Sequence, residues 1–253
     1  MDVLGPFQVL KRPLTLTASD SRSPPRDAGS GGTGPVAWWK LDETSGADAA
    51  DASGHHRIAR VQGQPRWAPD KGRSGGALEL DGAKNSLRCG EAAEFDFRDA
   101  MSVSLWFKTR GSDKSSRTLV AKGGENWRLQ LNGEKGTLGF TVTGPQATGV
   151  TNGRPTTITA KRAADDGQWH HVVALYDGKR VALYVDGEMG GSAAASGVIA
   201  VNTDPVTLGE NVLLRGRSFD GWLDDVRLYD RGLSEAEVQA LFRGGAASRA
   251  SAK

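Results

Sequence analysis

Four aspartates lie where a cation site built from loops would need them. They stand at the ends of expected strands or in turns that contain glycine: Asp42, Asp51, Asp81 and Asp224. Hard divalent cations bind several oxygen atoms, which come from carboxylates and from backbone carbonyls of irregular loops. We therefore expect these aspartates to hold a structural Ca²⁺ ion. The alternative, that they cap turns by bonding to their own backbone, stays open at this point.

Aromatic side chains are the second group that could act on a ligand. The chain has seven tryptophans, and an indole can stack on the C–H face of a sugar ring beside hydrogen-bonding side chains. Trp127 directly follows the loop 122–126, so one face of its ring is expected to be open. Asn152 and Arg154 lie in the polar, glycine-rich loop 144–155 and are expected to border a groove. For every tryptophan the alternative is burial in the core.

The overall composition excludes several classes of protein. The chain has 32 basic and 30 acidic residues among 253, so its formal net charge is only +2, and the two signs are interspersed. We therefore expect no nucleic-acid partner. No run of about 18 apolar residues occurs, which argues against a membrane-inserted helix, and the first residues do not resemble a signal peptide. Cys89 is the sole cysteine and is expected to be a small buried residue.

The elements that must position these residues are short strands separated by turns. Along 101–109 apolar side chains alternate, with Val103, Leu105 and Phe107 on one face and Trp106 and Lys108 on the other. Asp177-Gly178 between two apolar runs predicts a tight hairpin. Many such strands without intervening helices predict an all-β fold, an antiparallel two-sheet β-sandwich of the jelly-roll type.

The end of the chain predicts one short helix after the last strand. Ser234 with Glu237 forms a capping box, and apolar residues follow at helical spacing up to Phe242. Gly244 is expected to end this helix. The expected organisation is a disordered segment over 1–34, one sandwich domain over 35–245 and a disordered tail over 246–253.

The final strand and helix also carry a family resemblance. The segment reads GWLDDVRLY over 221–229, followed by DRGLSEAEV over 230–238. Five shorter motifs occur earlier in the chain, in this order: WKLDE at 39–43, GALELDG at 76–82, VSLWFK at 103–108, WHHV at 169–172 and LYVDG at 183–187. This ordered set resembles the laminin G-like (LamG) jelly-roll domains of the concanavalin A-like lectin/glucanase superfamily.

The resemblance implies a binding module and not an enzyme. It implies a structural calcium ion for which Asp224 matches the aspartate of the final strand, and a place in secreted, cell-surface or periplasmic proteins. The expected ligand is a carbohydrate, and the alternative is a protein partner in adhesion. Glycoside hydrolysis is the third possibility, because glycosidases need two carboxylates that flank the bond. The nearest acids, Glu94, Asp96 and Asp99, are expected in a loop, so we predict no catalytic residue.

Overall fold

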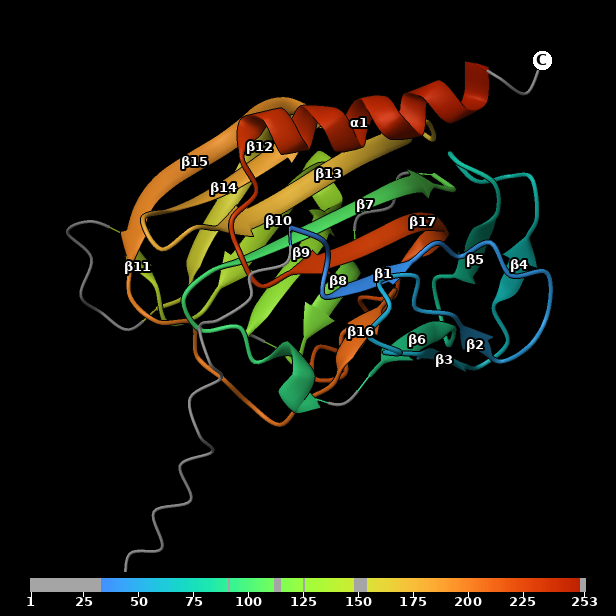
Figure 1. Cartoon of the computed structure of the whole chain (residues 1–253), viewed down its shortest axis with the longest axis horizontal. Helices are drawn as coiled ribbons and strands as arrows, with labels where there is room; N and C mark the ends of the chain where they lie inside the picture. The colour runs from blue at the N-terminus through green and yellow to red at the C-terminus, as the bar shows by residue number, and fades with distance from the viewer. Residues whose placement is uncertain (1–32, 91, 112–114, 125, 148–153, 251–253) are drawn as a thin grey trace, which may run out of the picture. The chain divides into compact units, whose positions relative to one another are not determined.

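The computed structural model describes residues 33–90, 92–111, 115–124, 126–147 and 154–250. Within these residues a nine-stranded and an eight-stranded sheet stack on each other, and the strands of each sheet pair in antiparallel fashion (Figure 1). The predicted antiparallel sandwich is confirmed. Residues 1–32 and 251–253 lie outside the described residues, so the expected limits of the disordered segments stay predictions.

The nine-stranded sheet has the strand order β11-β15-β14-β13-β7-β17-β5-β4, and β1 pairs with β17 beside this path. Its strands are β1 (Ala37–Trp39), β4 (Arg66–Ala68), β5 (Ala77–Asp81), β7 (Met101–Thr109), β11 (Gln146–Ala147), β13 (Trp169–Tyr176), β14 (Arg180–Val185), β15 (Glu188–Ser196) and β17 (Asp220–Tyr229). The centre of this sheet is therefore formed by β13, β7 and β17.

The eight-stranded sheet has the order β12-β10-β9-β8-β16-β6-β3-β2. Its strands are β2 (Asp48–Ala49), β3 (Ala59–Gln62), β6 (Ser86–Cys89), β8 (Arg117–Lys122), β9 (Trp127–Asn132), β10 (Thr137–Val142), β12 (Thr156–Ala163) and β16 (Val206–Leu208). Two short 3₁₀ turns, η1 (Ala92–Phe95) and η2 (Gly133–Lys135), join strands.

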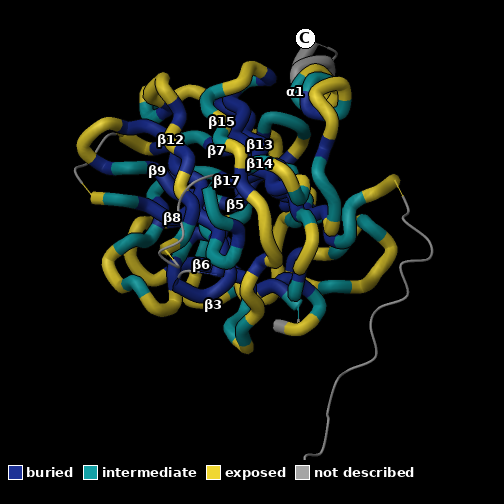
Figure 2. The backbone as a smooth tube through the Cα atoms, turned by 90° about the vertical axis from the view of Figure 1, so that its left-hand side faces the viewer, coloured by how far each residue is buried: buried dark blue, intermediate teal, exposed yellow. Residues whose placement is uncertain are grey.

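The core fills the space between the two sheets, as the alternating pattern predicts. On β7, Val103, Leu105 and Phe107 belong to this core, whereas Trp106 faces the other side of the sheet. Figure 2 shows the buried strands inside a shell of exposed connections. Cys89 is among the buried core residues, as expected. The hairpin at Asp177-Gly178 also forms, and it joins β13 to β14.

The outer face of the nine-stranded sheet carries the helix α1 (Glu235–Ala250) (Figure 1). The predicted capping box is present: the backbone N–H of Ser234 donates to Glu237 Oε2 at 2.8 Å, and the N–H of Glu237 donates to Ser234 Oγ at 3.3 Å. Val238 and Leu241 pack on apolar side chains of this face. The expected end at Gly244 is wrong, because the helix continues to Ala250. Two consecutive glycines, Gly244 and Gly245, are therefore not enough to end it, and the helix continues through the two alanines that follow, which favour helix.

Candidate functional site

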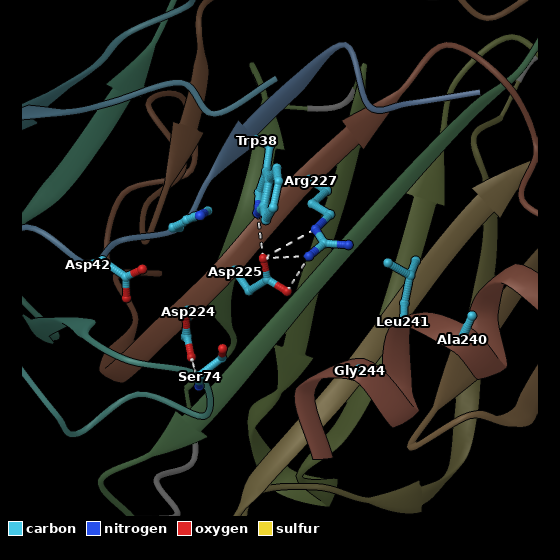
Figure 3. Close-up of a pocket in the computed structure, with 10 residues that line it drawn as sticks. Trp38, Asp42, Ser74, Asp224, Asp225, Arg227, Ala240, Leu241 and Gly244 are labelled. Carbon is cyan, nitrogen blue, oxygen red and sulfur yellow. Dashed lines mark hydrogen bonds and ion pairs between the residues drawn. The ribbon is translucent and has the colours of Figure 1, made fainter. Parts of the chain in front are cut away.

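The site is organised by an irregularity in the middle of β17. The pairing of β17 with β7 shifts register between Asp224 and Arg227, and Asp225 adopts a φ of 52°. Such a bulge places an extra residue on one strand and re-aims its neighbours. As a result Asp224, Asp225 and Arg227 all line one cavity of about 530 Å³ beside α1 (Figure 3).

Asp224 occupies the deep end of this cavity and is fully buried. Its Oδ2 accepts a hydrogen bond of 2.9 Å from the backbone N–H of Ser74. Its Oδ1 has no hydrogen-bond partner among the described residues. Burial, together with the negative charges of Asp225 and Asp42, raises the pKa of Asp224 to about 8, although backbone hydrogen bonds from Ser74 and Arg73 oppose this rise.

Asp42 lies at the exposed side of the same cavity, held against the glycine-rich loop 72–76. Its Oδ1 accepts a hydrogen bond of 2.6 Å from the N–H of Gly76. A side chain at Gly75, where φ is 80°, would stand 2.5 Å from that same oxygen. A side chain at Gly72 would stand 1.8 Å from the carbonyl oxygen of Gly76 and 2.8 Å from Asp224 Oδ2. Only glycines allow the loop to approach both carboxylates this closely.

These groups together form an oxygen-lined cradle, which we define as Asp42, Asp224 and the loop 72–76. Leu41 adjoins it, and this buried leucine has a left-handed φ of 61°, an uncommon conformation for a bulky residue. Its carbonyl oxygen lies 3.1 Å from where a Cβ of Gly76 would be. Buried carboxylate and carbonyl oxygens in an irregular loop are the donors that Ca²⁺ prefers, so the cradle fits a hard cation.

Nitrogen and sulfur ligands play no part in the cradle. No group of three or more His, Cys, Asp or Glu side chains suited to a metal occurs among the described residues. A cation in the cradle would therefore depend on two carboxylates, backbone carbonyls and water.

The other two aspartates expected in the cation site lie elsewhere and cap turns. Asp51 accepts hydrogen bonds from the N–H groups of Trp38, Ser53 and Arg57 at 2.8–3.0 Å. Asp81 Oδ1 accepts three more, at 3.0–3.3 Å, from the N–H groups of residues 83–85. Both residues thus match the turn-capping alternative. The structure brings Asp42 and Asp224 together, without Asp51 and Asp81.

The open part of the cavity is polar and its charges are paired. The indole Nε1 of Trp38 donates to Asp225, and Arg227 Nη2 donates to both carboxylate oxygens of Asp225 at 3.0 and 2.9 Å (Figure 3). The guanidinium of Arg227 lies 4.3 Å from the centre of the Trp38 ring, and Lys40 Nζ lies 4.9 Å from it. Two cations therefore lie close to the Trp38 ring within this cavity.

Of the residues expected to bind a ligand, Trp127 and Arg154 lie within the described part of the chain. Trp127 is fully buried, which corrects the expectation that one face of its ring is open. It pairs with Lys122 and Val142, which are also fully buried, so it points into the sandwich. Arg154 is exposed, and its carbonyl oxygen accepts a hydrogen bond from Gln146. Asn152 lies outside the described residues.

A row of tryptophans that the sequence did not single out crosses the outer face of the nine-stranded sheet. In register, Trp222 on β17 faces Lys108 on β7, which faces Trp169 on β13. Both indoles are half-buried. Arg110 lies 4.6 Å from the centre of the Trp222 ring and bonds to Glu79 at 2.6 Å. We call Trp222, Lys108 and Trp169 the tryptophan row.

The acids near η1 have structural partners. Glu94 pairs with Arg57 at 3.3 Å, and Asp96 pairs with the buried Nζ of Lys122 at 3.1 Å. Neither was expected to be catalytic. His171 is likewise structural, since its Nε2 lies 3.0 Å from Ser104 Oγ and burial lowers its pKa to about 3.

Comparison with solved structures identifies the same fold in binding domains. The binding domain of Paraclostridial Mosquitocidal Protein 1 matches with a TM-score of 0.66 and 19% identity over 84% of this chain and 52% of that one. The receptor-binding domain of botulinum neurotoxin mosaic serotype C/D matches with a TM-score of 0.64 and 15% identity over 85% of this chain and 52% of that one. This chain thus spans about half the length of these toxin domains.

A third match covers nearly the whole of a smaller domain. Domain 4 of AbnA, an extracellular arabinanase from Geobacillus stearothermophilus solved with arabinotriose, matches with a TM-score of 0.59 and 18% identity over 82% of this chain and 98% of that one. None of the helices within the described residues has the length and apolar character needed to cross a membrane. A laminin G-like family model matches residues 81–239, more than half of the sequence, so the chain belongs to the concanavalin A-like lectin/glucanase superfamily.

Proposed function

We propose that this domain is a non-catalytic module that recognises carbohydrate and works outside the cytoplasm. The observation that carries the proposal is the tryptophan row, with two half-buried indoles on one sheet face. Neighbouring strands are about 4.8 Å apart, so the two rings stand about 10 Å from each other across β7. Lys108 between them, and Arg110 and Glu79 beside them, supply hydrogen-bonding groups for sugar hydroxyls.

Two of the structural relatives support a carbohydrate ligand. The arabinanase domain was solved with arabinotriose, and a botulinum neurotoxin DC binding domain was solved with SialylT. A module that belongs to an extracellular enzyme also supports action outside the cell.

The proposal is tested by Trp169→Ala and Trp222→Ala, with binding to arabinan, xylan and glucomannan measured by calorimetry. Each variant should weaken binding about tenfold, which corresponds to about 1.4 kcal/mol. Trp67→Ala is the matched control, because Trp67 is a half-buried tryptophan on β4 outside the row. Wild-type protein that binds none of these glycans, or row variants that bind as well as the wild type, would count against the proposal.

We further propose that the cradle holds a structural Ca²⁺ ion. Asp42 and Asp224 would bind it, with backbone carbonyls of Leu41 and Gly76 as further donors. The ion would bind Asp224 Oδ1, which has no hydrogen-bond partner among the described residues, and it would fix the loop 72–76 against β17. The support is the buried, unpartnered Oδ1 of Asp224 and the close approach of the glycines.

Adhesion to a protein is the second candidate function, and exposed apolar side chains on neighbouring loops favour it. Leu213 is 61% exposed although its side chain packs beside Gly124, and Val201 and Val212 are exposed as well. A botulinum neurotoxin DC binding domain of this fold was solved with rat synaptotagmin II. Loss of a protein partner in Leu213→Ser, with unchanged binding in the tryptophan-row variants, would favour adhesion.

A further inference from the structure

A second candidate binding surface lies on the outer face of the eight-stranded sheet, away from the tryptophan row. It is a hollow of about 560 Å³ whose lining includes Arg57, Ile58, Arg60, Gln62, Arg88 and Glu94. We call it the arginine hollow. Its floor is the pair of strands β3 and β6.

Two arginines of the hollow face each other across these strands. Arg60 on β3 is directly opposite Arg88 on β6, and both side chains are exposed. Residues in this relation have Cβ atoms about 5 Å apart, and like charges placed so destabilise a sheet. The pair therefore costs stability unless an anion lies between the two guanidinium groups.

Few negative charges in the protein balance this pair. Arg88 makes no side-chain hydrogen bond or ion pair within the described part of the chain. Among the described residues, the one ion pair of Arg60 is with Asp48 at 4.0 Å. Both side chains are more than half exposed, and an ion pair in that setting contributes little to stability. Glu94 is paired with Arg57 at 3.3 Å, so its charge is already compensated.

The rest of the hollow suits a sugar chain. Ile58 is 45% exposed and offers an apolar surface to the C–H face of a sugar ring. Gln62 offers an amide at the other side of the arginine pair, in register with Ser86. Guanidinium groups bind planar carboxylates bidentately and bind sulfate oxygens as well.

We propose that the arginine hollow binds the acid groups, carboxylate or sulfate, of an anionic polysaccharide. The inference rests on the proposed carbohydrate recognition for the class of ligand, but it uses the opposite sheet and other residues. Arg60 and Arg88 bind the acid groups, and Ile58 and Gln62, on the two sides of Arg60 along the chain, contact the flanking sugar rings.

The test measures binding of the full chain to three polysaccharides and one other polyanion. Polygalacturonate carries carboxylates alone, dextran sulfate carries sulfates alone, dextran is neutral, and double-stranded DNA is anionic without being a polysaccharide. Arg60→Gln and Arg88→Gln should each weaken binding of the acidic polysaccharides about tenfold, since each removes charge-assisted hydrogen bonds. The affinity ratio between polygalacturonate and dextran sulfate distinguishes the two acid groups.

Lys161→Gln is the matched control, because Lys161 is an exposed cation on β12 at the opposite edge of the same sheet. It should leave the affinity unchanged. Unchanged binding in the double variant of Arg60 and Arg88, or an equal loss in Lys161→Gln, would overturn the proposal. Equal binding of neutral dextran, or of DNA with the same arginine dependence, would overturn the assignment to an acidic polysaccharide.

The result for the arginine hollow can be distinguished from the result for the tryptophan row. Arginine-dependent binding of acidic polysaccharide that persists in Trp169→Ala supports the hollow even where neutral glycans fail to bind. Acidic polysaccharide binding that is lost in Trp169→Ala and kept in the arginine variants overturns the hollow and leaves the row in place.

Discussion

Replacing Asp224 with asparagine tests whether the cradle is built for a cation. The amide has nearly the same shape as the carboxyl group but cannot ionise. In the unfolded chain Asp224 would titrate near 3.8, whereas in the folded protein its pKa is about 8. At 1.36 kcal/mol per pKa unit, ionising this buried group without a cation lowers the free energy of unfolding by on the order of 6 kcal/mol.

The sign of the pH dependence follows from these two pKa values. Between about pH 4 and pH 8 the folded state retains a proton that the unfolded state has lost, so the free energy of unfolding falls as the pH rises. Above about pH 8 both states are ionised and this decline ends. With a chelator present, the free energy of unfolding of the wild type should fall between about pH 4 and pH 8, and that of Asp224→Asn should not.

Added Ca²⁺ should reverse the loss in the wild type alone. An ion that binds only the folded state stabilises it by about 2.7 kcal/mol at a concentration 100 times its Kd. The assay is urea unfolding followed by tryptophan fluorescence from pH 5 to pH 9, with millimolar Ca²⁺ or with chelator. Equal stabilisation of Asp224→Asn by Ca²⁺, or the same pH profile in both proteins, would refute the reasoning.

Three further perturbations probe the packing around the sites. Gly75→Ala should abolish the Ca²⁺ effect on melting temperature because its Cβ would stand 2.5 Å from Asp42 Oδ1, whereas Gly54→Ala, at a similar positive φ with nothing within 4 Å, should keep it. Burial lowers the pKa of His170, but hydrogen bonds to Asp186 and Asp166 outweigh this effect and raise the pKa above its usual value. The stabilisation from the charged imidazole is therefore present below about pH 6.5 and is lost as the pH rises through the folded pKa. In His170→Asn, the free energy of unfolding measured by urea titration should no longer change with pH in this range. The buried Nζ of Lys122 donates hydrogen bonds to the backbone carbonyls of Asn202 and Asp204, and both carbonyls would lose this donor in Lys122→Met. The substitution should therefore lower the free energy of unfolding in urea titrations by roughly 2–3 kcal/mol. A loss below about 0.5 kcal/mol would contradict this role of Lys122.

The fold was predictable because its signals are local or periodic. Alternation along 101–109 identifies the inner face of β7, and Ser234 with Glu237 marks the start of α1. The helix end was not predictable from Gly244, because a glycine tolerates helical geometry and the residues after it decide whether the helix continues.

The sites depend on contacts between distant segments, which no local pattern reveals. Asp42 and Asp224 come near each other because both carboxylates accept hydrogen bonds from backbone N–H groups of the loop 72–76. Trp169 and Trp222 align only through the register of β7 with both of its neighbours. Trp127 follows a loop, yet the register of β9 turns its ring inward, so its place in the sequence could not decide its exposure.

The bulge in β17 gives two adjacent carboxylates opposite environments. Asp225 receives Arg227 and the indole N–H of Trp38, so its charge is compensated inside the protein. Asp224, one residue earlier, accepts backbone hydrogen bonds from Ser74 and Arg73, and its Oδ1 has no partner among the described residues. A buried carboxylate left in this state destabilises the fold near neutral pH unless a proton or a cation joins it. Because the glycines beside Asp224 hold carbonyl oxygens and the Asp42 carboxylate within reach, a cation explains the arrangement better than direct contact of Asp224 with a sugar would.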